Sequence, residues 1–432
     1  MTTFQGITAW TALDSRGWPT VAVRAEVGDA HAVAIAPAGA STGAHEDPER
    51  RDGGEPWQGR GVSEAVAHVN GPMAALLQGV DAADPWAIDA RLAQAVPSGG
   101  WGGNTTVAAT LALLLAEAAA RRMEPWQWVA ELTGTRQPTL PLPMVNIVSG
   151  GAHAGRAVDI QDVLVIPVGA RSFCEAIEMA AAVRRAVAKD VEACDPLLAR
   201  LVADEGGVVA IGNRNQDALE MVWSGIQSAG LAGSVSLALD IAATQFFSDD
   251  RYHLAAEGST LTGDELATVI RTWSQAYPIV SIEDPFAEDD WPAWRAHAAG
   301  LGIGQVIGDD LIATGTARLA QADDEACANT VLVKPNQAGS MARALDVLRE
   351  ARSRGIATVV SARSGDTEQD WLADLAVGSG AGQIKVGSLH RSERTAKWNR
   401  LLELESRFGA DLPYEGASAL AQTMTNRSGE SR

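Results

Sequence analysis

Cysteine is scarce in this sequence, which contains only Cys174, Cys194 and Cys327. An odd number of cysteines without paired spacing argues against a disulfide framework or a zinc cluster and favours a reducing compartment. Basic residues are also few, with 34 Lys and Arg against 54 Asp and Glu and a net charge of −20. Because no basic run interrupts this acidic background, we do not expect binding to nucleic acid.

Neither a signal peptide nor a membrane span is expected. The first ten residues, MTTFQGITAW, have neither the basic start nor the long apolar stretch of a signal peptide. The apolar run 107–120 is shorter than a membrane span and ends at Arg121 and Arg122, which favours a buried helix. We therefore expect a cytoplasmic protein with no membrane partner.

The chain is long enough for two domains, with 432 residues of which 46% are hydrophobic. Short β-like runs in 6–36 predict an antiparallel meander, and the pattern in 63–122 is helical. The Pro-rich stretch QPTLPLP (137–143) marks the expected domain boundary. The predicted parts are an N-terminal α+β domain (1–136), a second domain (137–416) and a C-terminal tail (417–432).

The second domain alternates short apolar runs with longer amphipathic ones. Seven runs rich in β-branched residues, from VLVIPV to GQIKVG, are predicted strands. Between them lie helical patterns such as 264–276 and 341–352, and the latter places Met341, Leu345 and Leu348 on one face. This alternation predicts an α/β fold with a mainly parallel sheet that is covered on both faces.

Six of the predicted strands end in a charged residue. The intervals between these charges are 43, 26, 25, 29 and 22 residues, close to the period of roughly 30 per unit in an eight-unit barrel. The long first interval has room for an extra excursion. The spacing predicts that all six lie at one end of a barrel: Asp240, Glu283, Asp309, Lys334, Arg363 and Lys385.

Such a cluster of charges indicates metal-assisted proton abstraction. Three converging carboxylates raise one another's pKa unless a cation lies between them, and oxygen ligands select a hard ion such as Mg²⁺. A lysine near other cations shifts toward the neutral form that a general base needs. Any one of these residues is more often a solvated loop residue, a helix cap or an ion-pair partner, so the prediction depends on the whole set.

Ordered motifs along almost the whole chain resemble enolase (phosphopyruvate hydratase). They include APAGASTGAHE, PMVNIVSGGAHAG, ADEGG, LALDIAATQFF, YPIVSIEDP, VKPNQAG, SARSGDTEQDWLADLAVG and GAGQIKVGSLHRSER. The resemblance implies an N-terminal α+β capping domain on an enolase-type (β/α)₈ barrel whose second strand is antiparallel. It also implies a homodimer or homo-octamer and a small anionic substrate that carries a carboxylate and a phosphoryl or phosphonyl group.

The resemblance also implies roles for single residues. Lys334 would remove the α-proton of the substrate, and Glu205 would protonate the departing hydroxyl. Ser41, in the GAST loop, would complete the coordination of a second Mg²⁺ that arrives with the substrate. His153, in the Gly-rich loop GGAHAG, would close over the site as part of a lid. The residues implied to bind the first Mg²⁺ are Asp240, Glu283 and Asp309. Those implied to bind the substrate are His153, Gln161, Asp162, Arg363, Ser364 and Lys385.

The sequence departs from the family motifs at several positions near these residues. Ala362 in SARSG replaces a histidine, Asp162 in IQDV replaces a glutamate, and Ala38 replaces a serine of the lid. Pro335 follows Lys334 and restricts the backbone before it, and Trp18 replaces an asparagine. The first two changes suggest a pocket for a larger or differently substituted substrate.

Three functions remain open at this point. The first is a lyase that converts 2-phosphoglycerate, or a close analogue, to an enolpyruvate ester. The second is a paralogue similar to carboxyphosphonoenolpyruvate synthase, an enzyme of phosphonate natural-product biosynthesis, in which Ala362 makes room for an extra carboxylate. The third is a non-catalytic binding protein, which the retained lysine and carboxylates argue against.

Overall fold

The N-terminal part of this computed structural model is a three-stranded antiparallel sheet, as the meander predicted. The model describes residues 4–40 and 42–420. The strands are β1 (Phe4–Leu13), β2 (Pro19–Val27) and β3 (Ala30–Ile35), in the order β1-β2-β3. A two-residue turn at Gly28 and Asp29 joins β2 to β3, and Gly28 has φ 54°, which glycine adopts easily.

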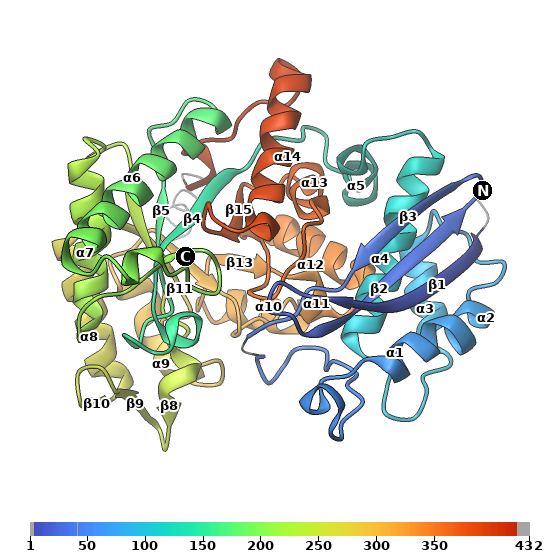
Figure 1. The fold of residues 1–432 in the computed structure, drawn as a ribbon, viewed down its shortest axis with the longest axis horizontal. Coiled ribbons are helices and arrows are strands. Elements are labelled where there is room, and N and C mark those ends of the chain that lie inside the picture. The colour runs from blue at the N-terminus through green and yellow to red at the C-terminus, as the bar shows by residue number, and fades with distance from the viewer. Residues whose placement is uncertain (1–3, 41, 421–432) are drawn as a thin grey trace.

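Helices cover one side of this sheet and form the right-hand side of the molecule in Figure 1. The long helix α4 (Gly103–Ala120) packs against β2 and β3. Among the described residues it alone has the length and composition of a membrane span, but 78% of it is buried inside the protein. It is therefore a core helix, as predicted. The other helices here are η1 (Pro56–Gly59), α1 (Ser63–His68), η2 (Val69–Met73), α2 (Ala74–Leu76), α3 (Pro85–Ala93) and α5 (Pro125–Thr133).

Eight strands close into a barrel through pairing of the first with the last. Seven of them are the predicted strands. The other, β4, was not predicted because its start lies in the Pro-rich stretch, where Pro143 is only its second residue. The strands are β4 (Leu142–Ser149), β5 (Asp162–Ile166), β7 (Ser236–Asp240), β11 (Ile279–Glu283), β12 (Gln305–Gly308), β13 (Thr330–Val333), β14 (Ala357–Ser361) and β15 (Gln383–Gly387).

Strand β5 is antiparallel to both of its neighbours, as the resemblance implied. Asp162, its first residue, pairs with Asp240 at the end of β7 and with Ser149 at the end of β4. Because β5 runs the other way, its N-terminal residue lies at the same end of the barrel as the C-terminal residues of its neighbours. The barrel therefore places Asp162 among the charges that end the parallel strands.

Helices surround the barrel. The predicted excursion between β7 and β11 forms a small three-stranded antiparallel sheet, whose strands are β8 (Phe247–Ser248), β9 (Arg251–Leu254) and β10 (Ser259–Leu261). Met341, Leu345 and Leu348 of α12 are buried, as predicted. The helices are α6 (Phe173–Cys194), α7 (Asn215–Ser228), α8 (Gly263–Ala276), α9 (Trp291–His297), α10 (Thr316–Asp324), α11 (Pro335–Ala338), α12 (Met341–Arg354), α13 (Trp371–Ser379) and α14 (Ser392–Phe408). The remaining short elements are β6 (Val208–Val209), η3 (Gly151–Ala154), η4 (Leu198–Arg200), η5 (Ala243–Phe246), η6 (Ala298–Gly300) and η7 (Gly409–Asp411).

A separate apolar cluster fills the middle of the barrel. Its members come from six strands and are almost completely buried: Leu142, Met144, Leu164, Ile166, Ala238, Ile307, Leu332 and Val359. Ala419 and Leu420 belong to the same cluster, so the start of the predicted tail packs against the barrel. The rest of that tail, 421–432, lies outside the described residues.

Candidate active site

The charged residues reach one end of the barrel because side chains alternate along a strand. The residue two positions after an inward-facing core residue also faces inward, but nearer the barrel's end. Thus Ala238 is followed by Asp240, Ile307 by Asp309, and Leu332 by Lys334. Five of the six predicted charges are buried at this end, and Lys334 is partly exposed. Five line one cavity, and Glu283, the sixth, bonds to Lys385 in its wall.

Lys385 lies between two of the predicted metal ligands. Its Nζ is 2.7 Å from Asp240 Oδ2 and 2.7 Å from Glu283 Oε2. Burial would lower the pKa of Lys385, but the two carboxylates raise it well above its ordinary value. Burial raises the pKa of Glu283 well above its ordinary value, and Asp240 adds to the rise. The other oxygen of Glu283, Oε1, is buried without a hydrogen-bond partner.

Lys334 donates a short hydrogen bond to Asp309, whose other oxygen accepts from Gln337 Nε2 at 2.9 Å. Burial would lower the pKa of Lys334, but the Asp309 carboxylate raises it. In this arrangement the Asp309 carboxylate therefore favours the charged form of Lys334, and the neutral amine stays a prediction. The reason is that a carboxylate, and not another cation, is its nearest charged neighbour.

Two acidic residues that follow the predicted ligands were not singled out from the sequence. Asp284 accepts the backbone N–H groups of Asp309 at 2.9 Å and Asp310 at 2.7 Å. Its own backbone has φ 41°, a strained conformation for a residue other than glycine and one that recurs at functional sites. The motifs SIEDP and GDD offered two acids each, and only the first of each was chosen.

Carboxylate oxygens of Asp284, Asp309 and Asp310 lie within 4.8 Å of one another. The predicted set of Asp240, Glu283 and Asp309 is not drawn together this tightly, since Lys385 separates the first two. Burial and then Asp309 raise the pKa of Asp310 to about 8. The acids therefore crowd one another, as the spacing of the strands predicted, but they are more numerous than predicted.

The same cavity is lined by a histidine that lies between two acids. His153 Nδ1 is 2.8 Å from Asp162 Oδ2, and its Nε2 is 3.9 Å from Glu205 Oε1. Asp162 also accepts from Asn146 Nδ2 at 2.6 Å and Ser149 Oγ at 2.7 Å. The shorter side chain at position 162 is thus held against His153 by three hydrogen bonds.

The charges around this histidine favour its protonated form. Burial would lower the pKa of His153, but Asp162 and then Glu205 raise it to about 9. Burial would raise the pKa of Glu205, but His153, Arg394 and the two site lysines lower it to about 2. The surroundings therefore favour the charged form of both His153 and Glu205.

The expected phosphate-binding residues lie where the two domains meet. Arg363 donates to Glu46 from Nη1 at 2.8 Å and from Nη2 at 3.1 Å. Ser364 Oγ accepts from the backbone N–H of Ala40 at 2.7 Å, and Ala38 pairs with Gly365. The lid segment is thus tied to the loop that carries Arg363. Glu46 ends the motif APAGASTGAHE and had no predicted role.

Two other residues singled out from the sequence, Gln161 and Ala362, line the same cavity. Gln161 donates to Asp240 Oδ2 at 3.1 Å and accepts from Gln245, which the sequence analysis did not include. Ala362 lines the cavity beside Arg363. Ser41, the expected ligand of the second metal ion, lies outside the described residues.

A hard divalent cation such as Mg²⁺ fits this end of the barrel. Its potential ligands are carboxylate oxygens, which such ions prefer. One of these oxygens, Glu283 Oε1, is buried with no partner, and burial and then the neighbouring carboxylates raise the pKa of Asp284 well above its ordinary value. Both features reflect negative charge that a cation would neutralise.

The fold and the site define a class: an α/β barrel enzyme of the enolase superfamily, with buried lysines and acids where its strands end. Comparison with known families narrows this class. Residues 137–423 match the family model described as "Enolase, C-terminal TIM barrel domain". Residues 4–129 match "Enolase, N-terminal domain". The chain belongs to the enolase family, as its motifs indicated.

Proposed function

We propose that the protein is a Mg²⁺-dependent lyase that removes the α-proton of 2-phosphoglycerate, or a close analogue, and expels the 3-hydroxyl. The observation that carries this proposal is the placement of two proton-transfer groups in one cavity. Lys334 lies beside Asp309, His153 lies beside Glu205, and all four residues line this cavity. An elimination needs a base for the proton and an acid for the leaving group.

Lys334 would take the proton from the α-carbon. It can do so only as a free amine, so Asp309 must stop stabilising its charge. Asp309 would be a metal ligand together with Asp240 and Glu283, and a ligand that shares its charge with a cation stabilises a neighbouring ammonium less. When bound, the ion would neutralise the substrate carboxylate and the charge that develops on it.

The acid half would supply a proton to the leaving hydroxyl. The C–O bond breaks as the C–H electrons form the double bond, and the hydroxyl leaves as water with a proton from the His153–Glu205 pair. Asp162 would hold His153 in place through its 2.8 Å contact. Arg363, released from Glu46, would bind the phosphoryl group, because guanidinium groups suit such oxyanions.

Ultraviolet absorbance of the enol product in an assay with 2-phosphoglycerate and Mg²⁺ tests this proposal. We expect Lys334→Ala to abolish turnover and Lys189→Ala, a change of an exposed lysine, to leave it unchanged. A wild-type rate no higher than that of Lys334→Ala would contradict the proposal for this substrate.

A second candidate activity, similar to that of carboxyphosphonoenolpyruvate synthase, is favoured by Ala362. Its small side chain lines the cavity next to Arg363, where a histidine would occupy space. A substrate with an additional carboxylate on phosphorus would use this space. The α-proton chemistry at Lys334 would be the same, so the two candidates differ only around the phosphoryl group.

Ala362→His separates these candidates. If 2-phosphoglycerate is the substrate, the added imidazole can donate to its phosphate, and kcat/KM should stay constant or rise. If the substrate carries the additional carboxylate, the imidazole should block it and lower kcat/KM by at least tenfold. Ala362→Gly controls for the change of residue without adding bulk.

A further inference from the structure

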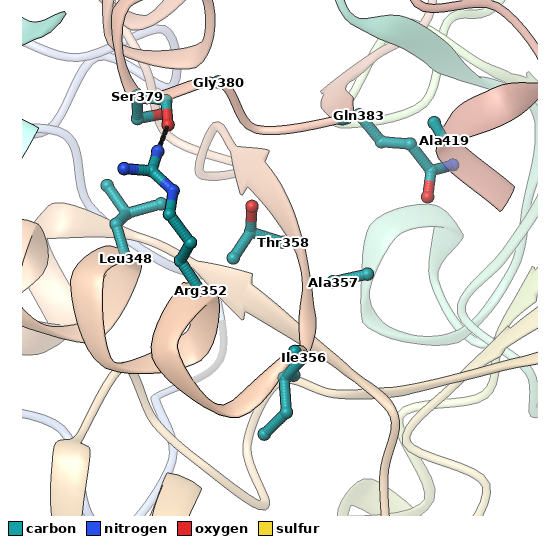
Figure 2. A pocket seen from close by; sticks show the side chains of 11 residues that line it. Leu348, Arg352, Ile356, Ala357, Thr358, Ser379, Gly380, Gln383 and Ala419 are labelled. Carbon is teal, nitrogen blue, oxygen red and sulfur yellow. Dashed lines mark hydrogen bonds between the residues drawn. The ribbon is translucent and has the colours of Figure 1, made fainter. Parts of the chain in front are cut away.

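The arginines of two cavities differ in the partners that they bond. Arg352, in the last turn of α12, is exposed and donates to Ser379 O, as Figure 2 shows. It also donates to Thr133 O at 2.9 Å and to Thr135 Oγ1 at 2.7 Å. These partners are neutral, and burial lowers the pKa of Arg352. Arg363, in the candidate active site, is instead buried and paired with an acid.

The acid that pairs with Arg363 is Glu46. Its two carboxylate oxygens accept from Nη1 at 2.8 Å and from Nη2 at 3.1 Å, and the side chains of Arg363 and Glu46 are only 4% and 7% exposed. Burial would lower the pKa of Arg363, but Glu46 raises it. A guanidinium pairs with a carboxylate and with a phosphoryl group through the same two-point geometry. Glu46 thus occupies the position in which a phosphoryl group would pair with these two nitrogens.

The chain holds Glu46 in this position. Glu46 lies between β3 and η1 in the N-terminal part, and its Oε1 also accepts from the backbone N–H of Gly43 at 3.0 Å. Arg363 follows β14 by two residues, so the pair joins the N-terminal part to the barrel. Because both partners belong to one chain, the effective concentration of this carboxylate exceeds that of an anion in dilute solution. An oxyanion that enters the site must therefore displace Glu46 or share Arg363 with it.

Sharing Arg363 is unfavourable because the surroundings are already rich in acids. Six acidic residues line this cavity, against four basic ones. Burial and then Asp309 raise the pKa of Asp310 to about 8, and Glu46 adds to the rise. A phosphoryl group beside Glu46 would add further negative charge to the same place. Displacement of Glu46 from Arg363 is the less costly route.

We propose that Glu46 is an internal competitor of the substrate's phosphoryl group for Arg363. In the empty site Glu46 neutralises the buried guanidinium, and the phosphoryl group binds as this carboxylate gives way. Glu46 thereby lowers the affinity of the site for oxyanions. If Glu46 served only to orient Arg363, its removal would weaken oxyanion binding instead. The inference rests on the proposed function only in its use of Arg363 as the phosphoryl-binding residue.

Calorimetric titration with inorganic phosphate, in chelator and at constant ionic strength, tests the proposal. We expect Glu46→Gln to bind phosphate at least tenfold more tightly than the wild type, because the amide has the shape of the carboxylate without its charge. In the Arg363→Ala background Glu46→Gln should bring no gain. Glu49→Gln is the matched control, since it removes the same charge from the same segment but from a residue that pairs with Arg51.

A second variant and a second readout cover the case in which Glu46→Gln does not fold, since it leaves a buried cation without its acid. Glu46→Asp keeps the charge on a shorter side chain, so it should show a smaller gain in the same direction. Phosphate should also raise the Tm of either variant more than that of the wild type. A phosphate affinity equal to or below that of the wild type, or a gain that persists with Arg363→Ala, would overturn the proposal.

This test is independent of turnover. Unchanged phosphate affinities would contradict the competition at Arg363 even if 2-phosphoglycerate is converted. Absence of turnover would contradict the proposed function even if Glu46→Gln binds phosphate more tightly.

Discussion

The two ends of the barrel are built from the same strands but differ in what they bury. Along β12 the inward-facing residues are Gln305, Ile307 and, just beyond the strand, Asp309; along β15 they include Gln383 and Lys385. One end thus holds neutral amides, the middle is apolar, and the other end holds charges. Burial stabilises the middle layer, whereas at the charged end each group is stable only because another compensates it.

This difference indicates that the charged end serves binding and contributes little to the stability of the fold. Buried ion pairs contribute little to folding when desolvation is included, but removal of one partner is costly because the other charge is left alone. The apolar layer behaves in the opposite way, since each side chain there contributes independently of metal ions. Four experiments sharpen or contradict this comparison.

The largest effect is expected from Lys385→Met, which leaves Asp240 and Glu283 facing each other without a cation. We expect a loss of about 3–5 kcal/mol in the free energy of unfolding in chelator, measured by urea denaturation. Mg²⁺ should recover part of this loss, because it can neutralise the same carboxylates. Lys189→Met is the control, and an equal loss with and without Mg²⁺ would contradict the comparison.

In the apolar layer, Leu332→Ala should cost about 3 kcal/mol, because the side chain is fully buried and leaves a cavity. The same urea experiment measures this loss. Here Mg²⁺ should make no difference to the loss relative to wild type. If Mg²⁺ reduced the difference in stability between this variant and the wild type, the two layers would not be independent.

Mg²⁺ itself should stabilise the wild type. At a concentration 100 times its dissociation constant, the gain is about 2.7 kcal/mol, visible as a higher Tm. Glu283→Gln should remove most of this gain, because it takes away a carboxylate with an unpartnered oxygen. Asp249→Asn, at an exposed acid, should retain it. Equal Tm shifts in Glu283→Gln and Asp249→Asn would indicate that Mg²⁺ binds at another site.

The fourth experiment concerns pH and His153. Its pKa is raised from 6.5 to about 9 in the folded protein, so the stability it contributes is complete below pH 6.5 and is lost as the pH rises through 9. His153→Gln should therefore flatten the pH dependence of unfolding in this window, by up to about 1.4 kcal/mol per pH unit. Identical slopes in wild type and variant would show that another group dominates.

Much of the fold could be predicted from local patterns. The meander, the core helix α4 and seven barrel strands follow from apolar periodicity and turn residues, which depend on neighbours along the chain. For the segment between β7 and β11 only an extra excursion was predicted, without its strands. Strand β4 escaped prediction because Pro143 masked its start. The proposed domain limits at 136 and 416 stay predictions.

The site was predictable only in part. The regular spacing of the strand ends predicted that Asp240, Asp309, Lys334 and Lys385 lie at one end of the barrel, because parallel strands end at the same edge. The pairing of these charges was not predictable. Whether Lys334 faces a carboxylate or another cation depends on packing between strands that are 25 residues apart, and this sets its protonation.

The sequence by itself determined the family, through its short motifs. It also determined the order of the strands and the identity of the charged residues, through the regular spacing of apolar runs that end in a charge. Only the tertiary structure decided which charges neutralise one another and how Asp162 holds His153. The physical reason is that these properties depend on distances between distant segments and on burial, which closure of the barrel creates.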